Sequence, residues 1–129
     1  MFIGTGFDGN QQAYTNSAFR VNSSAGELSA TDFNSSSDQT LKENIQTINS
    51  ALDIVQQLRG VRYNWKNSGQ SLIGVIAQEV DRVLPEVVSS NGDHLTVAYG
   101  NIVAVLIEAI KEQQNTIDQL SQTVERLIK

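Results

Sequence analysis

The pattern of apolar and polar positions changes character near residue 37. Residues 1–36 are rich in Gly, Ser, Thr and Asn and carry scattered apolar residues that fit no helical period. A short alternating stretch, 18–22, is typical of an isolated β-strand. A segment this polar buries little surface alone. We therefore expect residues 1–36 to be the end of a β-rich fibre or stalk that needs neighbouring chains.

After residue 37 the apolar residues recur three or four positions apart. Thr40 and Glu43 have the spacing of a capping box, with Thr40 as N-cap. The pattern predicts an amphipathic helix of about 18 residues that ends near Gly60. Its apolar face would consist of Leu41, Ile45, Ile48, Leu52, Val55 and Leu58.

The segment 61–97 mixes alternating stretches, short apolar runs and turn residues. Such a mixture predicts strands and a short helix rather than one long element. In chain order we expect a strand over 61–65, a turn at 67–69, a buried strand over 72–76, a short helix over 77–84 ended by Pro85, and a β-hairpin around 91–93.

From about Asn101 the chain follows a heptad repeat, which predicts a coiled-coil helix over about 101–129. The first heptad is also apolar at Ile102, Ile107 and Ala109, so this end should contact more than one surface. Ile or Val at a with Leu at d favours parallel dimers in simple peptides, so the pattern alone does not give a trimer. The a positions are Val103, Ile110, Ile117 and Val124, and the d positions are Leu106, Gln113, Leu120 and Leu127.

These elements predict an α+β fold in two parts. The β-rich segment 1–36 precedes a small mixed helix and strand domain, 37–129, with a long C-terminal helix. The 129 residues carry a formal net charge of -5, which argues against a nucleic-acid partner. No apolar run approaches the roughly 20 residues of a membrane span, so no membrane partner is expected. Without cysteine or clustered carboxylates, we expect no metal and no cofactor.

Candidate chemistry concentrates at 35–42. The single histidine, His94, lies beside a predicted turn and has no nucleophile signature next to it. A serine can instead be activated by a lysine that has lost its proton, although free lysine keeps its proton up to about pH 10.4. Lys42 would stand in the first turn of the expected helix, where the helix dipole disfavours an ammonium group. Ser37 would lie before that helix and so within reach of Lys42. The plainer alternative is an exposed ion pair between Asp38 and Lys42.

Residues 37–129 resemble the endosialidase-type intramolecular chaperone domain. The opening Ser37-Asp38-Gln39-Thr40-Leu41-Lys42-Glu43-Asn44-Ile45 is similar to the Ser-Asp-x-x-x-Lys-x-x-Ile start of that family. Gly74-Val75-Ile76-Ala77-Gln78-Glu79-Val80, then 83–88, the Tyr99 region and the helix at 106–112 follow in the family's order. Three motifs in the right order make a specific resemblance.

The resemblance implies a homotrimer at the C-terminus of a phage tail fibre, tailspike or neck appendage. Such domains assist folding of the upstream trimeric part and then cut the chain just before the motif serine. Carried over, Ser37 is the nucleophile, Lys42 is the general base, and Ser36–Ser37 is the scissile bond, in a single-turnover serine endopeptidase. We expect assembly in the host cytoplasm, with the mature upstream part in the virion.

Two other functions remain open at this stage. A non-catalytic trimerisation or receptor-binding tip would use the same heptads without Ser37 and Lys42. A release domain of a membrane-tethered cellular regulator fits the same motifs, but the fibre-like residues 1–36 argue against it. The remaining motif residues have plainer roles: Gly74 and the apolar run after it are expected in the core, Gln78 and Glu79 in structural contacts, and Tyr63 and Trp65 in packing.

Overall fold

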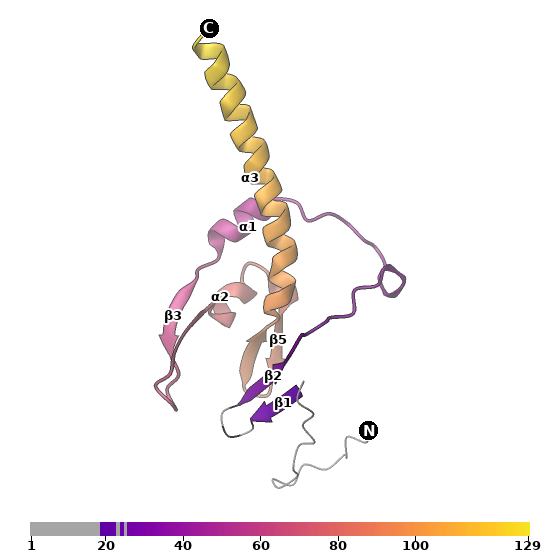
Figure 1. The fold of residues 1–129 in the computed structure, drawn as a ribbon, viewed down its shortest axis with the longest axis vertical. Coiled ribbons are helices and arrows are strands. Elements are labelled where there is room, and N and C mark those ends of the chain that lie inside the picture. Colours follow the sequence, from indigo (N-terminus) through magenta and orange to yellow (C-terminus); the bar gives the residue numbers. More distant parts are fainter. Residues whose placement is uncertain (1–18, 23, 25) are drawn as a thin grey trace. The chain divides into compact units, whose positions relative to one another are not determined.

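The structure, a computed structural model, describes residues 19–22, 24 and 26–129. The chain divides into two compact units, Met1–Ile45 and Gln46–Lys129. Figure 1 shows the order of the elements along both units.

The first unit contains one β-hairpin and one 3-10 turn in its described part. Strand β1 (Phe19–Asn22) pairs antiparallel with β2 (Glu27–Ala30), with Val21 opposite Leu28. The 3-10 helix η1 (Gln39–Leu41) follows after an extended stretch. The strand expected at 18–22 is confirmed from Phe19 onward. Residues 1–18, 23 and 25 of the expected fibre segment lie outside the described residues.

The second unit is a small α+β fold, as expected. Two antiparallel hairpins are joined by a short helix, and a long C-terminal helix packs against the first helix of the unit. The elements are α1 (Ala51–Gln57), β3 (Val61–Asn64), β4 (Ser71–Gly74), α2 (Ala77–Asp81), η2 (Pro85–Val87), β5 (Val88–Asn91), β6 (His94–Val97) and α3 (Tyr99–Leu127).

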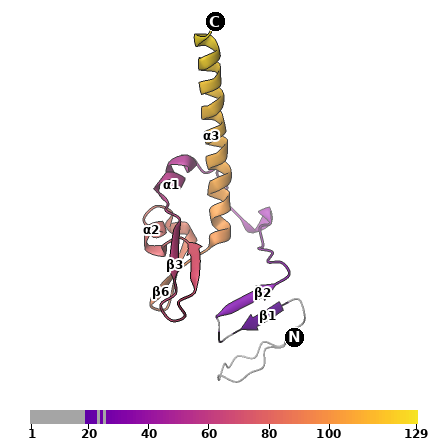
Figure 2. The same cartoon turned by 60° about the vertical axis from the view of Figure 1, so that its left-hand side comes forward.

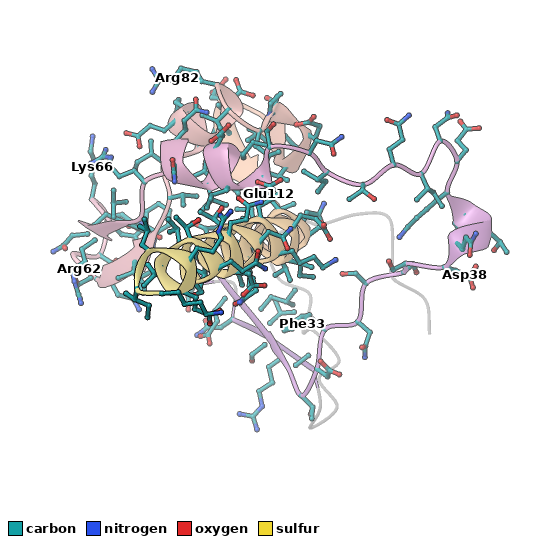
Figure 3. All side chains as sticks on the ribbon, turned by 90° about the horizontal axis from the view of Figure 1, so that it is seen from above. Phe33, Asp38, Arg62, Lys66, Arg82 and Glu112 are labelled. Atoms are coloured by element: carbon teal, nitrogen blue, oxygen red, sulfur yellow. The ribbon has the colours of Figure 1, made fainter. Side chains whose placement is uncertain are left out.

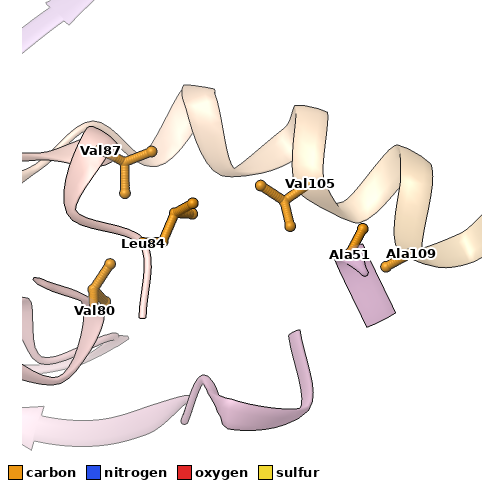
Figure 4. Packing of buried hydrophobic residues seen from close by; sticks show 6 residues of the cluster. All are labelled: Ala51, Val80, Leu84, Val87, Val105 and Ala109. Atoms are coloured by element: carbon orange, nitrogen blue, oxygen red, sulfur yellow. The ribbon is translucent and has the colours of Figure 1, made fainter. Parts of the chain in front are cut away.

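The core of this unit is small and runs from α2 and η2 along one side of α3 to α1 (Figure 4). Small and β-branched side chains dominate it, so helix α1 can approach α3 closely where Ala51 meets Ala109. The buried residues are Ala51, Val80, Leu84, Val87, Val105 and Ala109. Because so few side chains are fully buried, a large part of the apolar surface of the unit remains exposed.

The helix expected from Thr40 to about residue 58 is wrong in its first half. Only Ala51–Gln57 is α-helical, and residues 42–50 before it form neither helix nor strand, with left-handed backbone at Asn44 and Ser50. The reason is packing. Leu41 and Ile45 are exposed by 73% and 64%, whereas the later apolar positions pack on the core. A helical segment without a surface to cover is not stable in water, whatever its local pattern.

The strand expected over 72–76 exists as β4 but is not buried. Its register places Leu72 opposite Tyr63 of β3, and Ile73 is 71% exposed. The other expected elements of this segment, the strand at 61–65, the short helix before Pro85 and the hairpin around Gly92, are confirmed with slightly shorter bounds. The two-residue turn of the last hairpin uses Gly92 with positive φ, which favours glycine.

Helix α3 carries two different apolar faces. Val105 and Ala109 face the core of their own chain, whereas Val103, Leu106 and Ile110 are exposed. At 100° per residue the two faces lie roughly 110° apart around the helix axis. The C-terminal half of α3 projects beyond the other elements of its unit (Figure 2). The long helix is thus confirmed, with its a and d positions exposed along the whole length. Among the described residues, no helix combines the length and apolar character needed to cross a bilayer.

Candidate functional site

Ser37 and Lys42 meet within one chain. The Nζ atom of Lys42 lies 2.6 Å from Oγ of Ser37, at hydrogen-bond distance. Both residues belong to the first unit, and both are exposed, as is Ser36 on the other side of the expected scissile bond. The contact brings together the two residues that the sequence predicted as nucleophile and base.

A single 3-10 turn makes this contact possible. Asp38 accepts hydrogen bonds from the Thr40 backbone N–H at 2.8 Å and from the Thr40 hydroxyl at 2.6 Å. The backbone closes the turn with Leu41 N–H donating to the Asp38 carbonyl and Lys42 N–H donating to the Gln39 carbonyl. With this turn between Ser37 and Lys42, the side chains meet although they are five positions apart. Figure 3 shows the Asp38 side chain at this turn.

The same hydrogen bonds keep Asp38 ionised. The Thr40 hydroxyl, and then the Thr40 N–H, lower the pKa of Asp38 from its ordinary value, because both donate to the carboxylate. Asp38 therefore acts as an ionised cap of the turn.

The surface ion pair between Asp38 and Lys42 is not formed. In the described part of the chain the ion pairs are Arg59–Glu79 and Lys111–Glu108. The carboxylate of Asp38 is directed to Thr40, and the amine of Lys42 to Ser37. The geometry therefore favours a Ser37–Lys42 pair over the plainer alternative.

The expected helical environment of Lys42 is wrong. Lys42 has extended backbone, with φ −126° and ψ 148°, and follows a three-residue turn rather than opening an α-helix. A helix dipole therefore does not act on its amine. In the ammonium form Nζ donates to Oγ of Ser37, and only a neutral amine can accept the hydroxyl proton. The site has the geometry of a Ser-Lys pair, and in the single chain both side chains are exposed to solvent.

The other motif residues have structural contacts. The Arg59 guanidinium donates two hydrogen bonds to Glu79, of 2.6 and 3.2 Å. These hydrogen bonds lower the pKa of Glu79. Tyr63 and Trp65 stack edge to face, which agrees with a packing role. His94 is exposed at the start of β6. Among the residues described, no cluster of His, Cys, Asp and Glu has the geometry to hold a metal ion.

Two features were not predicted from the sequence, the hydrogen bonds of the turn at the site and the cap of helix α1. Thr40 was expected to cap an α-helix, but it is the donor to Asp38; the Asp-x-Thr spacing of a local side-chain turn was the available signal. Glu112 of α3 accepts hydrogen bonds from the first N–H groups of α1, and no local sequence signal points to a partner so distant along the chain.

Comparison with known proteins finds a similarity in the segment that begins at this site. Residues 37–89 match the family model described as chaperone of endosialidase, so the match starts at Ser37 itself. The long tail fiber protein Gp37 of Enterobacteria phage K3 and that of Enterobacteria phage T2 are each 35% identical over 94 residues. Gp37 of Salmonella phage S16 is 27% identical over 114 residues.

These alignments cover most of this chain but little of the relatives. They span 65%, 65% and 79% of the chain, and 8%, 7% and 15% of the respective Gp37 proteins. The likeness therefore concerns a short section of long fibre proteins. The family match, the order of motifs that it contains and the Gp37 relatives agree, and residues 37–89 are similar to the chaperone-of-endosialidase family.

Proposed function

We propose that this chain is a C-terminal intramolecular chaperone of a phage fibre, which associates as a homotrimer and then cuts its own chain between Ser36 and Ser37. The observation that carries the catalytic part is the 2.6 Å contact between Lys42 Nζ and Ser37 Oγ. It is supported by the family match, whose model carries a peptidase name and begins at Ser37. The fibre as the assisted protein is supported by the Gp37 relatives.

The reaction has two steps. Neutral Lys42 accepts the hydroxyl proton while Ser37 Oγ attacks the carbonyl carbon of Ser36, through a small ring that contains Oγ, Cβ, Cα and N of Ser37. The C–N bond then breaks, Lys42 returns the proton to the Ser37 amine, and residue 36 is held as an ester on Oγ. Water hydrolyses this ester, which regenerates the hydroxyl and leaves a carboxylate at Ser36. The net change is one peptide bond cut and one water consumed.

The base requires an environment that the single chain lacks. Ser37 and Lys42 are exposed to water, whereas a lysine that acts as a base must be neutral. Removal of water by a covering surface favours the neutral amine, and burial can shift a lysine by several pKa units. We propose that a neighbouring copy, or the upstream fibre, supplies this cover after assembly, so that the cut follows folding.

The exposed seam of α3 is the basis for association. Seven apolar side chains at a and d positions are exposed by 40% or more, and this row continues to the end of the helix. Such a stripe is stable in water only when other helices cover it. The number of three chains comes from the family resemblance. The proposed seam consists of Val103, Leu106, Ile110, Gln113, Ile117, Leu120, Val124 and Leu127.

A chaperone of this kind would assist the slow folding of intertwined fibre strands. Intertwined fibre strands have non-local contacts and fold slowly through aggregation-prone states. A C-terminal coiled coil aligns the chains and raises the effective concentration of the strands. Cutting the template away afterwards makes the assembled fibre hard to reverse. This would place assembly in the host cytoplasm and the upstream product in the virion.

The test is self-cleavage by the purified chain. Cleavage gives fragments 1–36 and 37–129, and intact-mass spectrometry resolves both. A non-catalytic trimerisation or receptor-binding tip uses the same exposed seam, so only the Ser37–Lys42 contact separates the two functions. If the chain associates and stays intact, the tip function is the better account.

A further inference from the structure

Tyr99 occupies a position that joins the long helix to the β3–β4 hairpin. It is the first residue of α3, and its hydroxyl oxygen accepts a 3.0 Å hydrogen bond from the backbone N–H of Val75, directly after β4. The same oxygen lies against Gly74, the last residue of β4. A Cβ atom added at Gly74 would overlap with Oη of Tyr99. The backbone φ of Gly74 does not require glycine. The reason for glycine at this position is therefore the close approach of the Tyr99 hydroxyl.

The heptad register extends back to the same tyrosine. Tyr99 stands four residues before Val103 and seven before Leu106, which makes it a d position of a preceding heptad. In spite of its contacts with the hairpin, Tyr99 is 53% exposed. One part of the Tyr99 side chain thus packs on Gly74, and the heptad position places the residue on the seam face of α3.

The surface around Tyr99 is apolar and hollowed. Two grooves meet at this residue, one of about 770 Å³ lined by Trp65 and Val97 among others, the second lined by Val61 and Ile73. Ile73 and Trp65 are largely exposed there. The apolar surface of the proposed seam therefore continues from α3 onto the hairpin, and a second copy of the chain that covers the seam would also meet this region.

We infer that Tyr99 is the first layer of the assembly seam, and that its contacts with Gly74 and Val75 fix the β3–β4 hairpin when copies of the chain associate. The inference rests on the proposed association through α3. It gives the Gly74-Val75 part of the central motif a role: the hairpin is tied to the first residue of the seam helix, and a second copy that covers the seam would shield this tie from water. Tyr99 acts here as a positioning residue and not as a catalytic one.

The Tyr99–Gly74 contact is tested by a double-mutant cycle on the full chain. Gly74→Ala should lower the denaturant midpoint in the wild-type background and lower it much less in the Tyr99→Phe background. Phenylalanine removes the overlapping oxygen, and the next atoms, Cζ of residue 99 and Cε1 of Tyr63, are at 3.5 and 3.4 Å. Gly60→Ala is the control, since its Cβ meets nothing within 4 Å. Equal costs of Gly74→Ala in both backgrounds would overturn the proposed contact.

The link to assembly is tested by amide hydrogen exchange at Val75. Ile110→Asp with Ile117→Asp should dissociate the chains and speed Val75 exchange at least tenfold, while the Leu52 amide, bonded to Glu112, changes little. Tyr99→Phe should speed Val75 exchange without weakening association, whereas Tyr99→Ala should do both. If the wild type sediments as a monomer, the proposed association is wrong. If the wild type associates, and its Val75 amide exchanges as fast as that of the dissociated Ile110→Asp, Ile117→Asp variant, this inference is wrong while the association stands.

Discussion

The carboxylate of Glu112 caps the helix that begins at Ala51. Its Oε1 accepts the Ala51 N–H at 2.9 Å, and its Oε2 accepts the Leu52 N–H at 2.8 Å. Ser50, the residue at the N-cap position, has left-handed backbone and makes no side-chain cap. The seven-residue helix α1 therefore takes its cap from α3, and it can form only when the long helix is in place.

Removing this cap should destabilise the second unit. Glu112→Ala leaves two N–H groups without their partner, so we expect a loss of about 1–3 kcal/mol in the free energy of unfolding. Glu112→Gln keeps one acceptor oxygen and should lower the free energy of unfolding by less. Denaturant unfolding measures both. Glu125→Ala, an exposed glutamate on the same helix, is the control, and an equal loss in that variant would contradict a capping role.

Asp38 should control the rate of cleavage through the turn η1. Asp38→Ala removes the acceptor for Thr40 and loosens the turn that brings Lys42 to Ser37. Because a small misplacement of reacting groups is costly, we expect cleavage to slow by roughly 10- to 100-fold. Asp38→Asn keeps the acceptor and should slow it less. Faster exchange of the Thr40 amide in Asp38→Ala, at an unchanged denaturant midpoint, would show that the effect is local. If Asp38→Ala loosens the turn and still cleaves at the wild-type rate, the proposed role of the turn is wrong.

The Arg59–Glu79 pair should make stability depend on pH. The hydrogen bond from Arg59 lowers the folded-state pKa of Glu79 below its ordinary value of 4.5. A lowered folded pKa contributes stability that is fully present above 4.5 and is lost as pH falls through the lower value. We expect the wild type to lose its advantage over Glu79→Gln as the pH falls below about 4.5. Midpoints measured from pH 7 to pH 3 test this. A stability advantage of the wild type over Glu79→Gln that grows toward low pH would contradict a lowered pKa of Glu79.

The long helix and the last hairpin were predictable from sequence, because their signals are local and agree with their packing. The heptads of 101–129 gave α3, and Gly92 gave the turn between β5 and β6. The helix expected from Thr40 failed because a local pattern cannot show that Leu41 and Ile45 have nothing to cover, while Ala51 meets Ala109.

The catalytic roles of the candidate pair stay a prediction, and the local structure around the pair was not predicted. The motif resemblance selected Ser37 and Lys42, and the contact between them is present. The expected helix dipole at Lys42 was wrong, since the turn is held by Asp38 and Thr40. The cap by Glu112 was not predictable, because it joins positions 61 residues apart through the tertiary fold.

Cleavage should require assembly. Ile110→Asp with Ile117→Asp puts like charges into the seam and should give monomers that do not cut, because Lys42 stays exposed to water. Asn115→Asp with Gln122→Asp adds the same charges at the same spacing, outside the a and d positions, and should change neither property. Sedimentation equilibrium and intact mass give both readouts. A folded monomer that cuts at the wild-type rate would show that the pair is activated within one chain.

Ser37→Ala and Lys42→Arg should each abolish cleavage and leave folding intact. Both side chains are exposed, so little packing is lost. Alanine removes the nucleophile, and arginine keeps the positive charge but does not give up its proton. Lys66→Arg, at an exposed lysine after β3, is the control and should cut normally. Shortening of Ser37→Ala at the wild-type rate would exclude Ser37 as nucleophile.

The central claim is the cut between Ser36 and Ser37, and intact-mass spectrometry with N-terminal sequencing of the wild-type chain tests it most directly. The account predicts two products, 1–36 and 37–129, with Ser37 as the new N-terminal residue. A chain that associates and keeps its full mass, or a new N-terminus at Ser35, Ser36 or any other residue, would contradict it.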